Sequence, residues 1–192
     1  MGDKNQTLYL SKYVPECEGR ILEIGSKDYG NTASFRDQYD YEEYVGIDME
    51  DGDGVDAIVD LVAGTGSLEK NYFDLAICCS VIEHVNRPWI FADNLSSLIK
   101  PGGLLYISAP WVWRYHPYPD DYWRFSWRGV EQLFPGFEWD HKFFSTNVIG
   151  EIFPAAHGSD DKAHILKDIG QDRVRKYLPY LNINMIGRKI AA

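Results

Sequence analysis

Short apolar segments recur along this chain, and the stretches between them have the spacing of amphipathic helices. This alternation is typical of a parallel sheet whose strands are joined by crossover helices. The segment FDLAICC at 73–79 is apolar almost throughout, as expected for a strand that is buried on both faces. The sequence therefore predicts an α/β fold with a doubly wound, mostly parallel sheet.

The expected elements follow one another without a repeat, a low-complexity segment or a linker, so the sequence predicts a single domain over residues 1–192. Seven segments are predicted to be strands: 20–23, 44–47, 55–59, 73–79, 104–109, 137–144 and 181–190. Helices are expected at 32–38, through Ile90 to Leu98 with an interruption at Pro88, from a Ser126 cap to Phe134, and at 159–177. Residues 1–19 are assigned to an N-terminal helix or cap.

Composition narrows the class of partner. The formal net charge is −10, which argues against duplex nucleic acid because phosphate neutralisation needs clustered Lys and Arg. The three cysteines have neither disulfide spacing nor the spaced pairs of a zinc site, so the sequence predicts no metal. Reduced thiols and the lack of a membrane-spanning apolar segment favour a cytoplasmic protein.

The turn after the first predicted strand comes close to a phosphate-binding loop. Gly25, Gly30 and Thr32 have the spacing of a P-loop, but Asn31 stands where the lysine belongs. Glu23 and Asp28 add negative charge, which repels a polyphosphate, and the G-x-G-x-x-G dinucleotide pattern is absent. A ligand that is cationic near this turn fits better.

S-adenosylmethionine (SAM) is such a ligand, because it carries a sulfonium and an ammonium group and no phosphate. Its ribose needs an acid at the end of the second strand, and Asp48 lies there, about 20 residues beyond the turn. Asp60 ends the third predicted strand, in a position to approach the adenine. The alternative is that Asp48 and Asp60 only begin turns, as Asp often does.

With these residues in place, the chain resembles a class I SAM-dependent methyltransferase of the small-molecule type. The resemblance is carried by ILEIGSKDYG, YVGIDMEDGDGVD, FDLAICCSVIEHV and LIKPGGLLYISAP, which together span about residues 20 to 110. It implies a seven-stranded sheet with helices on both faces and an antiparallel last strand, SAM as cofactor and S-adenosylhomocysteine (SAH) as product. It also implies a cofactor-binding half at 20–110 and an acceptor-side half at 111–192. One departure is Lys27, which replaces the middle glycine of the family's turn.

The resemblance also implies roles for single residues. Residues of the glycine turn would surround the methionine portion of SAM. Residues at the ends of the second and third strands would contact its ribose and adenine, and residues after the fourth strand would line the cofactor on the acceptor side. These positions are Glu23, Gly25, Ser26 and Gly30; Asp48, Met49, Asp60 and Leu61; and Ser80, Val81 and Ile82. The pair Glu83-His84 recurs in this group, and His84 either contributes to catalysis or braces the start of a helix.

Aromatic residues are concentrated at 111–127, where four of the six tryptophans lie. This segment is interpreted either as an acceptor pocket and lid or as a long loop packed on the sheet edge, and packing is favoured for Trp111, Trp113 and Trp127. The polar candidates for catalysis are His116, His84, Asp121, Tyr122 and Arg124, with His116 the first choice of general base. The pattern H-x-x-P-x-D-Y-W-R-F resembles methyltransferases associated with glycan or cell-envelope biosynthesis.

The sequence thus predicts methyl transfer to an O or N atom of a small-molecule or sugar acceptor. Two alternatives stay open: an NAD(P)-dependent oxidoreductase and a non-catalytic SAM-binding protein on the same fold. The sequence does not identify the acceptor, the oligomeric state or the role of residues 145–180, which include the histidines at 157 and 164.

Overall fold

The structure is a computed structural model that describes residues 4–30, 35–117, 119–146, 148–150, 152–154 and 180–191. Its strands are β1 (Arg20–Ile24), β2 (Glu43–Asp48), β3 (Ala57–Ile58), β4 (Phe73–Cys79), β5 (Ile99–Val112), β6 (Phe137–Ser145), β7 (Ile152–Pro154) and β8 (Leu181–Lys189). Its helices are α1 (Lys4–Tyr13), α2 (Pro88–Leu98) and α3 (Trp127–Leu133), with 3-10 turns η1 (Arg36–Gln38) and η2 (Ile82–His84).

The strands form one sheet in the order β3-β2-β1-β4-β5-β8-β6-β7. The five strands from β3 to β5 pair in parallel, whereas β8 is antiparallel to both β5 and β6. The predicted class I methyltransferase fold is therefore confirmed, with the short β7 added antiparallel to β6 at the edge. Because β1, β2, β3, β4 and β5 run in the same direction, the segments that follow them meet at one rim of the sheet.

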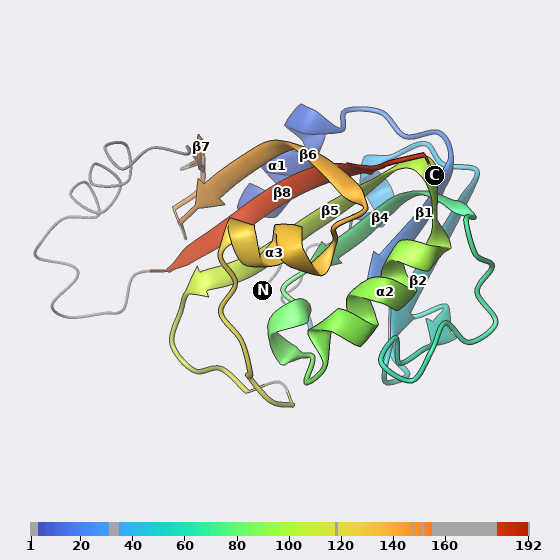
Figure 1. Cartoon of the computed structure of the whole chain (residues 1–192), viewed down its shortest axis with the longest axis horizontal. Coiled ribbons are helices and arrows are strands. Elements are labelled where there is room, and N and C mark those ends of the chain that lie inside the picture. Colours follow the sequence, from blue (N-terminus) through green and yellow to red (C-terminus); the bar gives the residue numbers. More distant parts are fainter. Residues whose placement is uncertain are drawn as a thin grey trace, which may run out of the picture.

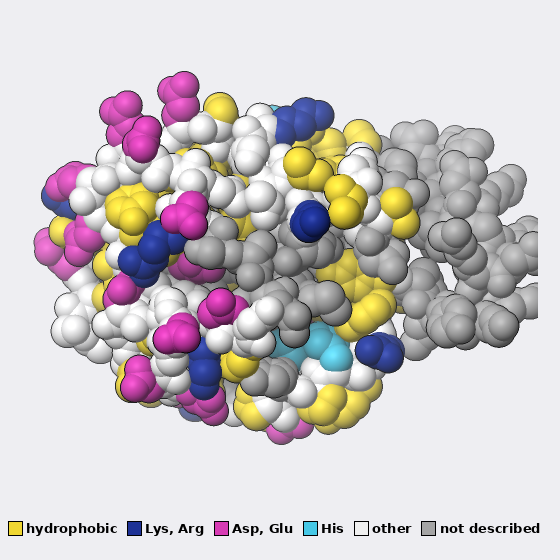
Figure 2. Space-filling model, turned by 180° about the vertical axis from the view of Figure 1, so that it is seen from behind, with side chains coloured by type: hydrophobic (Ala, Val, Ile, Leu, Met, Phe, Trp, Pro, Cys, Tyr) yellow, Lys and Arg dark blue, Asp and Glu magenta, His cyan; other side chains and the backbone are white. Residues whose placement is uncertain are grey.

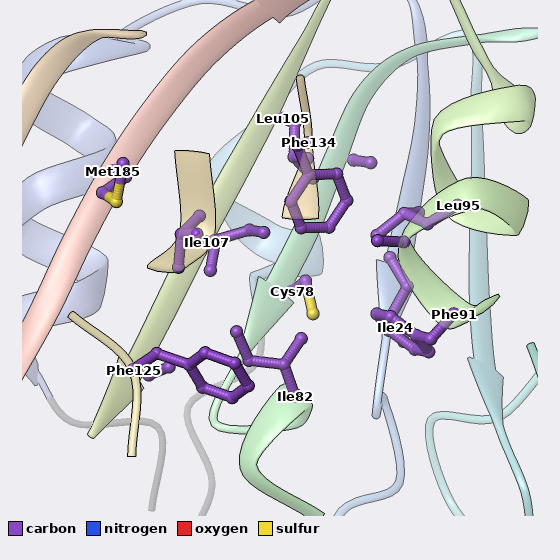
Figure 3. Close-up of a cluster of buried hydrophobic side chains, with 14 of the residues drawn as sticks. Ile24, Cys78, Ile82, Phe91, Leu95, Leu105, Ile107, Phe125, Phe134 and Met185 are labelled. Carbon is purple, nitrogen blue, oxygen red and sulfur yellow. The ribbon is translucent and has the colours of Figure 1, made fainter. Parts of the chain in front are cut away.

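Helices cover both faces of the sheet: α2 and α3 lie on one face and α1 on the other (Figure 1). Strand β4 alternates between the two layers, with Ala76 and Cys78 in the core beneath α2 and α3, and Leu75 and Ile77 in the core beneath α1. Figure 3 shows the first of these cores, in which Phe91 and Leu95 of α2 lie beside Ile24 of β1. Burial on both faces explains why this strand is a continuous apolar run.

The residues at the starts of α2 and α3 explain why these helices begin there. Pro88 is the first residue of α2 and does not interrupt the helix, because a first-turn N–H needs no intrahelical partner. Ser126 caps α3 as predicted, its hydroxyl accepting a hydrogen bond from the backbone N–H of Gly129 at 3.1 Å.

Three predicted elements differ in extent. The part of the 32–38 helix that is described is only the 3-10 turn η1, after which the backbone becomes extended at Tyr39, whose ring is buried in the core beneath α1. The third strand is reduced to Ala57–Ile58, and β5 begins earlier than predicted because Ile99 already pairs with Phe73. The helix expected at 159–177 lies outside the described residues.

Among the described residues, no helix combines the length and the apolar character needed to cross a bilayer. Acidic side chains gather on the left half of the face shown in Figure 2, in keeping with the net charge of −10.

Replacement of Leu95 by Ala tests the packing of α2 on the sheet. Leu95 is fully buried, so the variant should lose about 2–5 kcal/mol of unfolding free energy through lost contacts and a cavity. The matched control is Leu8→Ala on α1, where the side chain is 44% exposed and the loss should stay below about 1 kcal/mol. Urea unfolding followed by circular dichroism measures both, and equal losses would contradict this packing.

Candidate functional site

The glycine turn after β1 is held tightly against its neighbours. The backbone N–H groups of Gly25 and Ser26 both donate to the carbonyl of Ile47, at 2.9 and 3.1 Å. Gly25 has a φ of +72°, and a Cβ at this position would lie 2.5 Å from a methyl carbon of Val81. Position 25 therefore needs glycine both for its conformation and for the close approach of the segment that follows β4.

The side chains of the glycine turn are not arranged to bind phosphate. Lys27 forms an ion pair with Glu50 at 2.7 Å and lies along Gly52, so its charge is directed at the loop after β2. Ser26 lies against Gly46, where a Cβ would come 2.7 Å from its hydroxyl oxygen. Asp28 accepts the backbone N–H of Gly30 at 2.6 Å, and Gly30 has a φ of +79°. The extra bulk of Lys27 is thus accommodated outside the turn.

Glu23 is the acid nearest this turn on β1. It is partly buried, and its carboxylate accepts a hydrogen bond from the Tyr44 hydroxyl at 2.5 Å. Burial raises the pKa of Glu23 to about 7, although the hydrogen bond from Tyr44 opposes this shift. A cationic group bound beside Glu23 would favour its ionised form.

The ends of β2 and β3 lie together at the rim. The backbone N–H of Val59 donates to the carbonyl of Asp48 at 2.8 Å, which places Asp60 two residues beyond Ile58, the partner of Asp48 in the sheet. Asp48 and Asp60 each use one carboxylate oxygen to accept a backbone N–H two residues ahead, at 3.1 and 2.8 Å. The turn role considered in the sequence analysis is therefore present at both positions.

The two apolar residues predicted beside the adenine differ in exposure. Met49 is 59% exposed next to Asp48, so its side chain is available to a ligand. Leu61 is buried, and its carbonyl accepts the side-chain amide of Asn94 at 2.8 Å.

The segment after β4 begins with an unusual backbone. Ser80 has a φ of +54°, and its N–H donates to the carbonyl of Ser108 on β5 at 2.7 Å. Its hydroxyl lies 3.3 Å from the amide nitrogen of Gln6, which also donates to the Ser108 hydroxyl at 2.9 Å. Gln6 is fully buried, so α1 closes this part of the rim. The sequence carries no signal that would have singled out Gln6.

A polar cluster joins η2 to the aromatic segment 111–127. Its members are Glu83, His84, His116, Asp121 and Arg124. The rings of His84 and His116 lie 5.0 Å apart between centroids, and a carboxylate oxygen of Glu83 lies 3.8 and 3.9 Å from their Nε2 atoms. Of the predicted catalytic residues, four are thus brought together.

Each imidazole is oriented through its other nitrogen. The Nδ1 atom of His84 is 2.5 Å from the carbonyl of Asp120. The Nδ1 atom of His116 is 3.0 Å from the carbonyl of Arg114 and 3.1 Å from a carboxylate oxygen of Asp121. The same Asp121 oxygen accepts the backbone N–H of His116 at 2.8 Å. Both Nε2 atoms are left facing Glu83.

Charge is distributed unevenly in this cluster. Arg124 forms a bidentate ion pair with Asp121, in which one bond measures 2.7 Å, and this pairing lowers the pKa of Asp121 to about 2. Burial raises the pKa of Glu83 to about 8, since both of its carboxylate oxygens are buried and accept no hydrogen bond from another described residue. Burial lowers the pKa of His84.

The aromatic segment is fixed to η2 by backbone hydrogen bonds. The N–H groups of Tyr122 and Trp123 both donate to the carbonyl of Glu83, at 2.8 and 3.2 Å, and the indole N–H of Trp123 donates to the carbonyl of Val85 at 2.9 Å. The side chain of Tyr122 is 48% exposed and its hydroxyl bonds to Asp120, so it lies outside the polar cluster. Trp127 is buried, whereas Trp111 and Trp113 are partly buried.

Glu83 was missed as a member of the candidate site, because only the pair Glu83-His84 was noted. Its burial was the missing information, and the adjoining apolar residues Ile82 and Val85, which are also buried, are the signal that could have indicated it.

Solved structures share this fold at low sequence identity. A SAM-dependent methyltransferase from Archaeoglobus fulgidus is 15% identical, with 96% of this chain and 94% of that chain covered and a TM-score of 0.56. Phosphoethanolamine N-methyltransferase 2 of Haemonchus contortus, in complex with SAM, is 15% identical over 97% of this chain and 52% of that one, with a TM-score of 0.62. The 1,6-didemethyltoxoflavin-N1-methyltransferase of Burkholderia thailandensis, with its substrate and SAH bound, is 14% identical over 98% and 78%, with a TM-score of 0.62.

These likenesses establish the class I methyltransferase fold. The sequence itself matches the family model described as a methyltransferase domain over residues 5–145, and the chain belongs to that family. A comparison with curated proteins found no significant match.

Replacement of Gly25 by Ala tests the close approach at the rim. The variant combines a strained positive φ with a clash against Val81, so it should lose more stability than Gly30→Ala, where a Cβ meets no atom of the described residues within 4 Å. We expect about 1–2 kcal/mol for the control from the left-handed backbone alone. A double-mutant cycle with Val81→Ala, measured by urea unfolding, should recover a coupling of about 0.5–3 kcal/mol. A coupling of zero would mean that the two segments do not touch.

Proposed function

We propose that this chain is a SAM-dependent methyltransferase that transfers a methyl group to an O or N atom of a small-molecule or sugar acceptor, with SAH as product. The observation that carries the proposal is the rim of the sheet. There a glycine turn with a partly buried acid, Glu23, adjoins Asp48 and Asp60, and the one lysine of the turn is paired with Glu50. This arrangement favours a phosphate-free, cationic adenosyl compound over a nucleotide. Membership of the methyltransferase domain family supports it.

In the proposed complex, the methionine portion lies against Glu23, Gly25, Ser26 and Gly30, and the ribose hydroxyls bond to Asp48. Met49 and Leu61 flank the adenine, with Asp60 near its edge. Ser80, Val81 and Ile82 line the acceptor side. For Ser26, Leu61 and Ile82 the contact is proposed through the backbone, because the Ser26 side chain lies against Gly46 and those of Leu61 and Ile82 are buried.

Small acceptors are supported by two proteins of the same fold. The Haemonchus protein is a phosphoethanolamine N-methyltransferase, and the Burkholderia protein methylates N1 of 1,6-didemethyltoxoflavin. Phosphoethanolamine and 1,6-didemethyltoxoflavin are both small molecules. A sugar acceptor is supported only by the pattern in the aromatic segment.

Methyl transfer from a sulfonium is an in-line displacement in which the acceptor attacks the methyl carbon and SAH leaves. The protein mainly positions the acceptor and excludes water, and good orientation contributes roughly 7–11 kcal/mol. A hydroxyl acceptor must also lose a proton. His116 is the proposed base, oriented by Asp121, which Arg124 holds ionised, while His84 is the second candidate and Tyr122 borders the site.

We also propose that residues 20–110 form the cofactor half and 111–192 the acceptor half of one domain, with 1–19 as its cap. A reducing, cytoplasmic location is supported by Cys17, Cys78 and Cys79, which form no disulfide. The aspartates at the rim argue against duplex nucleic acid as the acceptor.

Calorimetry with SAH tests the cofactor. SAH and SAM should bind, and ATP and NADH should not, because the lysine of the glycine turn is paired with Glu50 and the described residues of the rim include Glu23, Asp48 and Asp60, which repel phosphates. Asp48→Ala should weaken SAH binding by about 10–100-fold through loss of charged hydrogen bonds to the ribose. The matched control is Asp51→Ala, an exposed aspartate whose carboxylate bonds to the neighbouring Gly52 N–H.

The alternatives give different outcomes in the same experiment. Tight binding of NADH with no binding of SAH would replace the proposal by an oxidoreductase. SAH binding without methyl transfer from labelled SAM to any of a panel of small-molecule and sugar acceptors would favour the non-catalytic SAM-binding protein.

SAH affinity should also depend on pH through Glu23. With a pKa of about 7, Glu23 is mostly protonated at pH 6 and mostly ionised at pH 8, and only the ionised form attracts the ammonium group. Affinity should therefore rise about threefold to tenfold between pH 6 and 8. Glu23→Gln keeps an acceptor for the Tyr44 hydroxyl and should flatten this dependence. A wild-type affinity that falls or stays constant over this range would contradict the role of Glu23.

A further inference from the structure

Glu83 is the fully buried carboxyl group of the polar cluster. Its side chain is 0% exposed, and neither carboxylate oxygen accepts a hydrogen bond from another described residue. The neighbouring cation, Arg124, is already committed to Asp121. A buried carboxyl group without a partner is costly, so it is either protonated or paired with a cation that binds from outside.

Two imidazoles of the described residues face this carboxylate. Glu83, His84 and His116 each offer one ligand atom, and the three atoms lie within 4.8 Å of one another. Three atoms that lie within 4.8 Å of one another have a central point no more than about 2.8 Å from each, so small side-chain shifts bring that point to the roughly 2.0–2.2 Å of zinc–nitrogen and zinc–oxygen bonds.

The imidazoles are also oriented as metal ligands usually are. A ligating histidine normally donates its other ring N–H to a carboxylate or a backbone carbonyl, which fixes the ring and its tautomer. His84 has the Asp120 carbonyl at its Nδ1 atom, and His116 has both the Arg114 carbonyl and the Asp121 carboxylate there. In both residues the Nε2 atom is the one directed at Glu83.

We infer that Glu83, His84 and His116 form a binding site for a divalent transition-metal cation of the Zn²⁺ type, with Asp121 as the positioning residue of His116. Two nitrogen donors and one carboxylate suit Zn²⁺ and its first-row neighbours, whereas Mg²⁺ prefers oxygen ligands alone. Three protein ligands leave coordination positions for solvent or an acceptor. The side chains of His84 and His116 are 14% and 30% exposed, so the site opens on their side.

This inference changes the proposed chemistry of the site. In the metal-bound protein the Nε2 atom of His116 is a ligand and cannot abstract a proton. Loss of a proton from an acceptor hydroxyl would then be promoted by coordination to the cation, which lowers the pKa of a bound oxygen. Metal binding itself does not depend on whether the chain transfers methyl groups.

The test uses the metal-free full chain, with Zn²⁺ in calorimetry and Co²⁺ in visible absorption. We expect one Zn²⁺ per chain and the d–d absorption of Co²⁺ in a four- or five-coordinate nitrogen and oxygen site. Excess Mg²⁺ should not displace either ion. Glu83→Gln and His116→Ala should each weaken Zn²⁺ binding by at least about tenfold and remove the Co²⁺ bands, and Asp121→Asn should weaken binding by about 10–100-fold.

The matched controls are Glu138→Gln, at an exposed glutamate of β6, and His141→Asn, at a histidine of β6 whose ring contacts Tyr13. Both should bind Zn²⁺ as the unaltered chain does. Because His116 is partly exposed, His116→Ala keeps the test valid if Glu83→Gln fails to fold. Zn²⁺ binding that is absent, or that is unchanged in both Glu83→Gln and His116→Ala, overturns the inference. SAH calorimetry on the same samples keeps this outcome separate from a failure of the proposed function.

Discussion

The absence of a side chain at position 25 lets the turn after β1 pack against the segment after β4. With a Cβ there, Val81 would be only 2.5 Å away, so the two segments could not meet as they do. The same turn is held to β2 by two N–H groups that share the carbonyl of Ile47. Three strand ends are thereby locked into one rim, and each proposed cofactor contact depends on their relative positions.

A second junction positions the segment that we propose as the acceptor side. The backbone carbonyl of Glu83 receives the N–H groups of Tyr122 and Trp123, which brings a segment from beyond β5 onto η2. This contact places His116 beside His84 and leaves the Glu83 carboxylate enclosed between them. Arg124 neutralises Asp121, so that Glu83 has no lysine or arginine paired with it among the described residues.

The strands were predictable where one physical signal dominates. The segment 73–79 is apolar because both faces are buried, and its predicted bounds agree with β4. Ser126 is a cap by its local chemistry alone, and the structure places its hydroxyl on the Gly129 N–H. The prediction was weaker at 55–59, where only Ala57 and Ile58 pair with β2 and few apolar residues mark the strand. The predicted interruption of a helix at Pro88 was wrong, because Pro88 is the first residue of α2.

The sequence by itself determined the fold class and the acids at the rim, because strand periodicity and the position of a residue at the end of a strand are local properties. It also indicated His84 and His116 as separate candidates. Only the tertiary structure decided that these imidazoles face one buried carboxylate, since His116 is reached through a loop whose path is set by backbone hydrogen bonds to Glu83. Backbone N–H groups are the same at nearly every residue, so such a contact leaves no pattern in the sequence.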